Sequence, residues 1–123
     1  MLTDSPLVEI RLTPEFQRKL KNLAKKYRQV PTDLQPVLEQ LQLGVFLGEQ
    51  IPGIGSPVIK VRIRNSDTQK GKSGGYRLIY WISSTKLIVL LDIYSKSDRE
   101  DIEIDEIRQI IKGFSTTSEE TDA

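Results

Sequence analysis

Apolar residues recur at two different spacings in the first third of the chain. Residues 7–12 alternate apolar and charged side chains, which is the period of a half-buried strand. Residues 14–28 carry apolar side chains at helical spacing, and Thr13 and Pro14 before them suit an N-cap and a first helical turn. We expect a second helix from Thr32 or Asp33 to about Gly44, with Pro36 in its first turn. The short connection between the two helices predicts a helix hairpin.

The second half of the chain shows mainly strand signals. Residues 44–57 contain four glycines and two prolines, so we expect an irregular loop there. Three strands are predicted over residues 58–64, 76–82 and 87–94, and the last two are close enough in sequence to form a hairpin. Residues 97–100 match a Ser-x-x-Glu capping box, and isoleucines at helical spacing follow it. This pattern predicts a short final helix.

Together these elements predict an α+β domain. Its sheet is small and mainly antiparallel, in the order strand, helix hairpin and three strands, with the helices on one face and a short C-terminal helix. We place this single domain at residues 7–114. Residues 1–6 are expected to be a flexible N-terminus, and residues 115–123 a disordered acidic tail, because they have almost no apolar content.

The composition excludes several kinds of chemistry. The 123 residues include no histidine and no cysteine, which rules out Cys/His zinc sites, disulfides, a cysteine nucleophile and a Ser-His-Asp triad. With 37% hydrophobic and 28% charged residues, the chain has an ordinary globular composition. Its longest apolar run is far too short to span a bilayer, and Thr3, Asp4, Ser5 and Pro6 follow Met1 and Leu2 where a signal peptide would be apolar. We therefore expect a cytoplasmic protein without a membrane partner.

The net charge of +1 conceals an uneven distribution. Residues 1–97 contain fifteen Lys and Arg against eight Asp and Glu, a charge of +7, whereas residues 98–123 contain three against nine, a charge of −6. Two clusters of cations lie in the basic part, one over residues 11–28 and one over residues 60–77. The first could be simply a solvated helix face. Such asymmetry also fits a polyanionic partner.

The second cluster gives the stronger signal. In a strand over residues 58–64, the period of two sends Lys60, Arg62 and Arg64 to one face and the isoleucines and valine to the other. Alternate residues are about 6–7 Å apart, comparable with successive phosphates of an extended nucleic-acid strand. Arg77 opens the neighbouring strand, and Lys70 and Lys72 lie in the loop before it. We interpret this face as a nucleic-acid surface. A charged sheet face that only maintains solubility is the alternative.

Other motifs carry less weight. The segment Gly71-Lys72-Ser73 resembles the end of a phosphate-binding loop, but position 66 is serine instead of the required glycine, and a strand follows instead of a helix. The carboxylates of residues 98–106 lack the cadence of a calcium loop and suit a helix N-terminus. No metal and no cofactor are expected. Any one of four strand aromatics could stack on an unpaired base, although each is more simply a core residue (Tyr76, Tyr80, Trp81 and Tyr94).

Several segments of the chain also resemble a known family. The stretches VIKVRIR, GKSGGYRLIYWI and KLIVLLDIYSKSDREDI, followed by an Ile-rich amphipathic helix, are similar to the RelE/ParE superfamily of type II toxins, and most similar to its RelE and HigB-like members. The resemblance covers roughly residues 7–112. It implies the RelE/ParE-like fold and an mRNA interferase, that is, an endoribonuclease that represses translation in the ribosomal A site. The implied partners are mRNA, the ribosome and a cognate antitoxin, which we expect to be a small helix-turn-helix protein.

The resemblance also assigns site residues by position. The basic pair of the family's strand falls on Lys60 and Arg62, the arginine after the Gly-aromatic step on Arg77, and the later basic residue on Lys96 or Arg99. The chain departs from the family pattern in two ways. Arg62 replaces a lysine, and no aromatic residue lies between Tyr94 and Phe114 where the family has a tyrosine.

The implied reaction is attack of a ribose 2′-OH on the adjacent phosphate, which needs a base, charge stabilisation and an acid. Lysine at its usual pKa of about 10.4 is a poor base at neutral pH, and neighbouring like charges lower that pKa. We therefore assign the base role to Lys60, the phosphate clamp to Arg62 and Arg77, and the acid or further stabilisation to Lys96 or Arg99. Four more residues are predicted to bind RNA, namely Arg64, Lys70, Lys72 and Tyr76.

Two other functions stay open on the sequence. A ParE-like toxin would have the same fold but inhibit gyrase, and a non-catalytic relative would bind RNA or protein without cleavage. The ordered row of cations favours the nuclease. The sequence does not predict the oligomeric state.

Overall fold

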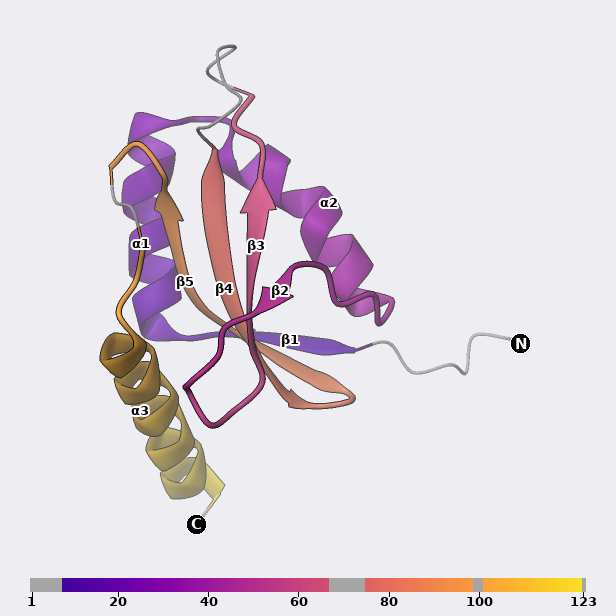
Figure 1. Ribbon diagram of the computed structural model, residues 1–123, viewed down its shortest axis with the longest axis vertical. Coiled ribbons are helices and arrows are strands. Elements are labelled where there is room, and N and C mark those ends of the chain that lie inside the picture. Colours follow the sequence, from indigo (N-terminus) through magenta and orange to yellow (C-terminus); the bar gives the residue numbers. More distant parts are fainter. Residues whose placement is uncertain (1–7, 67–74, 99–100, 123) are drawn as a thin grey trace, which may run out of the picture.

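The computed structural model describes residues 8–66, 75–98 and 101–122, with residues 116–122 described by their backbone alone. Five strands form one sheet in the order β1-β5-β4-β3-β2, in which β1 is parallel to β5 and the other neighbours are antiparallel (Figure 1). This arrangement confirms the predicted α+β class with its mainly antiparallel sheet. The elements in chain order are β1 (Glu9–Leu12), α1 (Pro14–Lys26), α2 (Val30–Gln42), β2 (Glu49–Gln50), β3 (Val58–Ile63), β4 (Tyr76–Ser84), β5 (Leu87–Ser95) and α3 (Ile104–Asp122).

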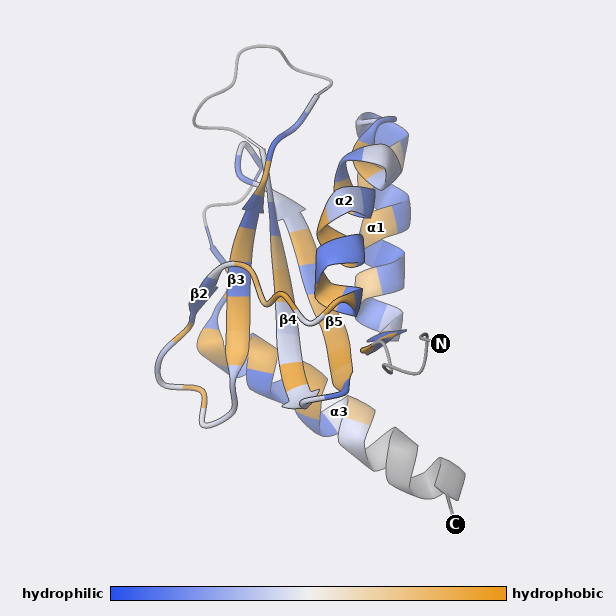
Figure 2. Ribbon diagram, turned by 90° about the vertical axis from the view of Figure 1, so that its right-hand side faces the viewer, coloured by the Kyte–Doolittle hydropathy of each residue, from blue (hydrophilic) through white to orange (hydrophobic). Residues whose placement is uncertain are grey.

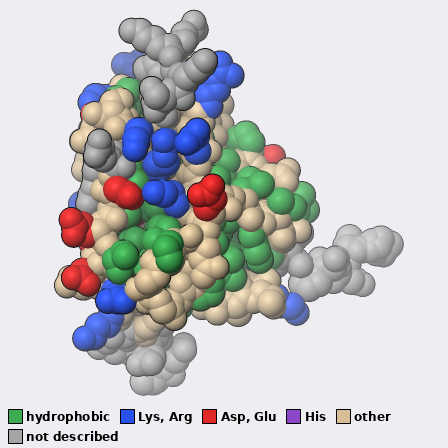
Figure 3. All heavy atoms as spheres, in the orientation of Figure 1, with side chains coloured by type: hydrophobic (Ala, Val, Ile, Leu, Met, Phe, Trp, Pro, Cys, Tyr) green, Lys and Arg blue, Asp and Glu red, His purple; other side chains and the backbone are tan. Residues whose placement is uncertain are grey.

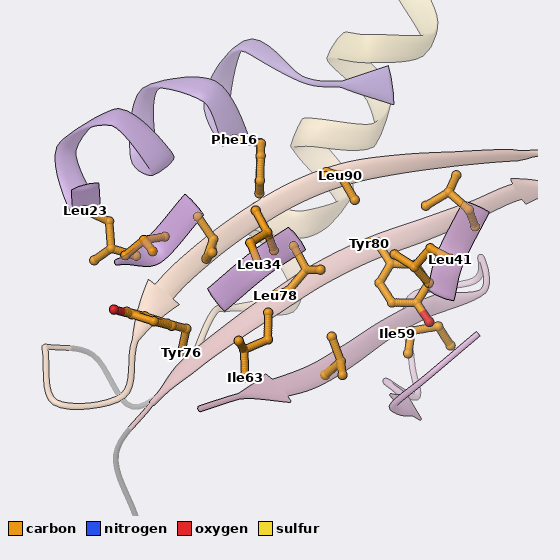
Figure 4. Close-up of a cluster of buried hydrophobic side chains, with 14 of the residues drawn as sticks. Phe16, Leu23, Leu34, Leu41, Ile59, Ile63, Tyr76, Leu78, Tyr80 and Leu90 are labelled. Carbon is orange, nitrogen blue, oxygen red and sulfur yellow. The ribbon is translucent and has the colours of Figure 1, made fainter. Parts of the chain in front are cut away.

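The helices lie on both sides of the sheet. Helices α1 and α2 cover one face, and α3 and β2 lie toward the other (Figure 2). The α1/α2 side holds the larger core, in which Phe16, Leu34 and Leu41 of the helices meet Leu78 and Tyr80 of β4 (Figure 4). On the opposite side, α3 packs its isoleucines on a second cluster that covers only part of the sheet. The remainder of that face is available for charged side chains.

Helix α1 begins as its sequence indicates. Thr13 is the N-cap, its side-chain oxygen accepts a hydrogen bond from the Phe16 N–H at 3.1 Å, and Pro14 occupies the first turn. The same hydroxyl donates to the Leu90 carbonyl at 2.9 Å, so one buried side chain also ties the helix start to β5. A cap of this kind contributes on the order of 1 kcal/mol to the free energy of unfolding.

Two predicted helix starts are wrong. Helix α2 begins at Val30, ahead of the expected Thr32 or Asp33, and Pro36 consequently lies inside it. Pro31 takes the first-turn position instead, where its missing N–H costs no hydrogen bond. Helix α3 begins only at Ile104, because Ile102 is buried in the second core and residues 101–103 are not helical.

Helix α3 is also longer than expected. Its backbone continues to Asp122, through most of the segment for which the sequence predicts no element. A helix that already exists adds each further residue at little cost, even where no apolar side chain is buried. None of the helices in the described residues is long and apolar enough to cross a membrane.

The loop predicted over residues 44–57 contains one regular element. Strand β2 is only two residues long, and it pairs with β3 so that Glu49 is opposite Lys60. By contrast, the β4–β5 hairpin follows the prediction, since β4 ends at Ser84 and β5 begins at Leu87.

Candidate functional site

Strand β3 alternates buried and polar side chains as its period of two requires. Ile59, Val61 and Ile63 are buried in the core against α1 and α2. Lys60 and Arg62 therefore point to the opposite face of the sheet, where Lys60 is half-buried and Arg62 is exposed. Arg64 is exposed and comes after the end of the strand.

Arg77 stands beside this pair on β4. The register places Arg77 directly opposite Arg62, so the two residues are cross-strand neighbours. Arg77 is only 8% exposed, and its Nη1 donates to the Tyr76 carbonyl at 3.2 Å. A cation this deeply set cannot move freely, which suits a fixed anion-binding group better than a merely solvated charge.

The three cations and β2 enclose a cavity of about 320 Å³, which we call the cationic hollow. Figure 3 shows Lys and Arg side chains gathered on this face of the molecule, with acidic side chains beside them. The residues that line it are Gly48, Glu49, Lys60, Arg62 and Arg77. The structure thus brings together three of the predicted site residues. It adds Glu49, which the sequence reasoning missed because β2 was not recognised as a strand.

Gly48 allows β2 to approach β3 this closely. A Cβ atom at this position would lie 2.5 Å from the Lys60 carbonyl oxygen and 2.8 Å from the Ile59 Cγ2, well inside contact distance. The backbone of Gly48 also has φ of +107°, a conformation that side chains disfavour. Glycine at this position therefore sets where Glu49 stands relative to Lys60.

A second carboxylate touches the site from its other side. The Lys60 Nζ lies 3.4 Å from an oxygen of Asp101, which also accepts a hydrogen bond from the Tyr94 hydroxyl at 3.2 Å. Tyr94 reaches this face because of an irregularity in β5. Ile79 is paired with Asp92, whereas the next residue, Tyr80, is paired with Leu90.

This one-residue shift is a β-bulge at Leu91, and it reverses the alternation of the strand. Without it, Tyr94 would face α1 and α2; with it, Tyr94 stands opposite Arg77. Sequence alternation alone gave no signal for this placement.

Other predicted site residues lie elsewhere. Tyr76 is fully buried on the α1/α2 side, edge-to-face with Tyr27 at 5.8 Å between ring centroids, so the structure does not bring it to the cationic hollow. Lys96 follows β5, and its N–H donates to the Gly75 carbonyl at 2.9 Å. Three predicted residues lie outside the described part of the chain, namely Lys70, Lys72 and Arg99.

A second cavity, of about 280 Å³, lies between α1 and the end of β5. Near it, the ammonium of Lys19 pairs with the fully buried Asp92 at 2.8 Å and with Glu106 of α3 at 3.4 Å. At its rim, Lys26 pairs with Asp98 at 2.8 Å, and this bond raises the pKa of Lys26. The acidic groups already match the cations here, so this cavity is less suited to an anion than the cationic hollow. Within the described ranges, no three acidic side chains cluster closely enough to hold a metal ion.

Comparisons with known proteins bear on this site. A family profile described as "RelE toxin of RelE / RelB toxin-antitoxin system" matches residues 16–122. Among solved structures, the crystal structure of TrmO from Pseudomonas aeruginosa is similar at 15% sequence identity, with a TM-score of 0.45 over 76% of this chain. The chain spans 38% of the length of that protein. At this level of similarity, nothing about the function of this chain follows from it.

Proposed function

This chain belongs to the RelE toxin family of toxin–antitoxin systems, and we propose that it acts by cleaving mRNA on the ribosome. Membership in this family supports a role as a toxin with an antitoxin partner. The ribosome, the mRNA and the cleavage step are our proposal. The observation that carries it is the cationic hollow, where Lys60, Arg62 and Arg77 converge on one cavity.

The hollow has the properties of a phosphate site. Guanidinium groups bind phosphate oxygens in pairs and keep their charge at any physiological pH. Arg62 and Arg77 are directly opposite each other on β3 and β4, so one phosphate can contact both. When a 2′-OH attacks this phosphate, negative charge grows on its oxygens, and fixed cations stabilise the transition state more than the substrate. We assign this role to Arg62 and Arg77.

The reaction also needs a base that takes the 2′-OH proton. Two groups line the hollow from opposing positions on β2 and β3, namely Glu49 and Lys60. Lys60 is the base that the sequence suggests, but it is also paired with Asp101, an arrangement that suits a cation which binds phosphate. Glu49 is the alternative base, because a carboxylate oxygen can accept the 2′-OH proton directly.

Substitution of each residue separates the two bases. Glu49→Gln and Lys60→Met are the matched variants, since each removes one candidate base at similar size. We expect Glu49→Gln to lose most of its cleavage if Glu49 takes the 2′-OH proton, and to keep most of it if Lys60 does. Lys96 or Arg99 remains our candidate for the acid that protonates the leaving 5′-oxygen, or for further charge stabilisation.

The gyrase and binding-only alternatives are tested in expressing cells. We expect induction of the protein to produce new mRNA 5′ ends, mapped by primer extension, without breaks in DNA. Arg62→Ala should abolish these ends, because it removes one of the two guanidinium groups to which we assign stabilisation of the transition state. Because Arg62 is exposed, its loss leaves the core intact. DNA breaks without mRNA ends would support the gyrase target instead. Growth arrest with neither product would support a protein that binds without cleavage.

A further inference from the structure

We propose that Asp101 and Tyr94 are positioning residues that hold the ammonium of Lys60 at the edge of the cationic hollow. The inference rests on the proposed function in one respect, namely that Lys60 acts on bound RNA. Neither Asp101 nor Tyr94 carries a role in the proposed reaction. They lie at the end of β5 and in the stretch that leads into α3, both distant in sequence from Lys60.

One oxygen of Asp101 collects three donors. Its Oδ1 accepts from the Lys60 Nζ at 3.4 Å, from the Tyr94 hydroxyl at 3.2 Å and from the Ile102 N–H at 2.9 Å. These donors come from β3, from β5 and from the residue next to Asp101. The carboxylate therefore ties the middle of one strand to the end of another across the face that carries the site.

The Asp101 carboxylate is held in place by buried neighbours, although the Asp101 side chain is 61% exposed. Ile102 is 7% exposed and packs into the core under α3, which anchors the backbone beside Asp101. Tyr94 is 5% exposed and belongs to the same core, so its hydroxyl approaches from a rigid position. Two anchored neighbours thus aim one oxygen at Lys60.

The protonation states keep this contact in place. Burial raises the pKa of Tyr94 well above its usual range, and the charge of Asp101 adds to the effect, so the phenol remains a donor. For Asp101, partial burial opposes ionisation, but the Ile102 N–H and the charge of Lys60 outweigh it and lower the pKa. The carboxylate is therefore charged throughout the physiological range.

A role in stability does not account for the contact. Ion pairs between solvent-accessible groups contribute little to stability, and the side chains of Lys60 and Asp101 are 34% and 61% exposed. Position is a better explanation. Lys60 has a flexible stem and two arginines as neighbours, which repel its ammonium. A fixed carboxylate on its far side counters this repulsion. Within the described residues, Asp101 is not among those that line the cationic hollow, so a bound phosphate can still contact Lys60.

This arrangement predicts opposite effects on binding and on rate. The charge of Asp101 repels RNA, whereas its contact orders Lys60. Asp101→Asn keeps an acceptor for the Ile102 N–H but removes the charge that holds the ammonium. We expect this variant to bind RNA as tightly as the unaltered protein or more tightly, and to cleave about tenfold more slowly under saturating conditions.

The control is Asp105→Asn. It removes the same charge nearby, from a side chain that is 85% exposed and pairs with Arg108 at 3.6 Å instead of Lys60. A purely electrostatic effect would alter both variants alike, with tighter binding and no loss of rate. Tyr94→Phe, which removes only the hydroxyl, should lower the rate in the same direction as Asp101→Asn. A cleavage rate in Asp101→Asn equal to that of Asp105→Asn would overturn the proposal.

A second measurement needs no cleavage. The ammonium of Lys60 can be followed by NMR of its side-chain nitrogen, assigned by its disappearance in Lys60→Arg. We expect its order parameter to fall in Asp101→Asn and to be unchanged in Asp105→Asn. An unchanged value in Asp101→Asn would overturn the positioning role, whatever the enzyme does. A drop in order, in a protein that cleaves no RNA, would support positioning and refute the proposed function.

Discussion

Replacement of Gly48 by alanine tests how the cationic hollow is built. The added Cβ would lie 2.5 Å from the Lys60 carbonyl oxygen, so β2 has to move away from β3. The positive φ of +107° alone costs about 1–2 kcal/mol for a residue with a side chain. Weakening the hydrogen bonds between β2 and β3 costs about 1 kcal/mol more for each bond lost. We expect a total loss of about 2–4 kcal/mol in the free energy of unfolding.

The chain offers a matched control for this substitution. Gly44 also has a positive φ, +87°, but a Cβ there meets no atom within 4 Å. Gly44→Ala should therefore lower the free energy of unfolding only by the cost of placing a side chain at a positive φ, about 1–2 kcal/mol. Denaturant unfolding gives both values, and thermal unfolding should show a separation of about 4 °C for each kcal/mol between the two variants.

The same pair has a functional readout. Displacement of β2 moves Glu49 away from its position opposite Lys60, so Gly48→Ala should reduce mRNA cleavage more strongly than Gly44→Ala. RNA binding should change little in either variant, because Arg62 and Arg77 stand on β3 and β4. Equal unfolding free energies and equal cleavage rates for the two variants would refute the reasoning that the close approach of β2 shapes the site.

Three other properties follow from the structure. Lys19→Met should destabilise the fold by roughly 3 kcal/mol in denaturant unfolding, the low end of the range for a broken buried pair. It removes the ammonium that pairs with the fully buried Asp92 at 2.8 Å, while Lys19 itself is 26% exposed. A loss below about 1 kcal/mol would contradict this. Burial raises the pKa of Tyr80 from 10.0 to about 12, so the folded state holds this proton more tightly, and stability should fall as pH rises from 10 to 12. Tyr80→Phe should flatten that decline, and an equally steep decline in the variant would rule out Tyr80 as its source. Arg62→Ala should reduce the slope of log K against log salt for single-stranded RNA by about 0.7, whereas Lys86→Ala, at the exposed β4–β5 turn, should leave it unchanged.

The sequence predicted those parts of the fold that local patterns determine. The alternation in β3 placed Lys60 and Arg62 on one face correctly, because a buried strand face fixes the register of its side chains. Thr13 and Pro14 marked the start of α1, since capping depends on residues that are adjacent in the chain. The β4–β5 hairpin followed from two strand signals and a short connection.

The parts that were missed depend on contacts between distant segments. Strand β2 has only two residues, and its pairing with β3 relies on Gly48, so Glu49 could not be placed from its own neighbours. Tyr94 reaches the site through a bulge that no periodicity indicates. The start of α3 was wrong because burial of Ile102 prevails over a local capping pattern.

Cleavage of mRNA on programmed ribosomes by the purified protein tests the central claim most directly. The assay maps new 5′ ends after incubation with the unaltered protein, with Arg62→Ala and with Lys86→Ala. The account predicts defined cleavage by the unaltered protein and by Lys86→Ala, and a loss of at least about a hundredfold in Arg62→Ala, as for removal of one group that stabilises a transition state. Intact mRNA with folded, unaltered protein, or cleavage by Arg62→Ala at the full rate, would contradict it.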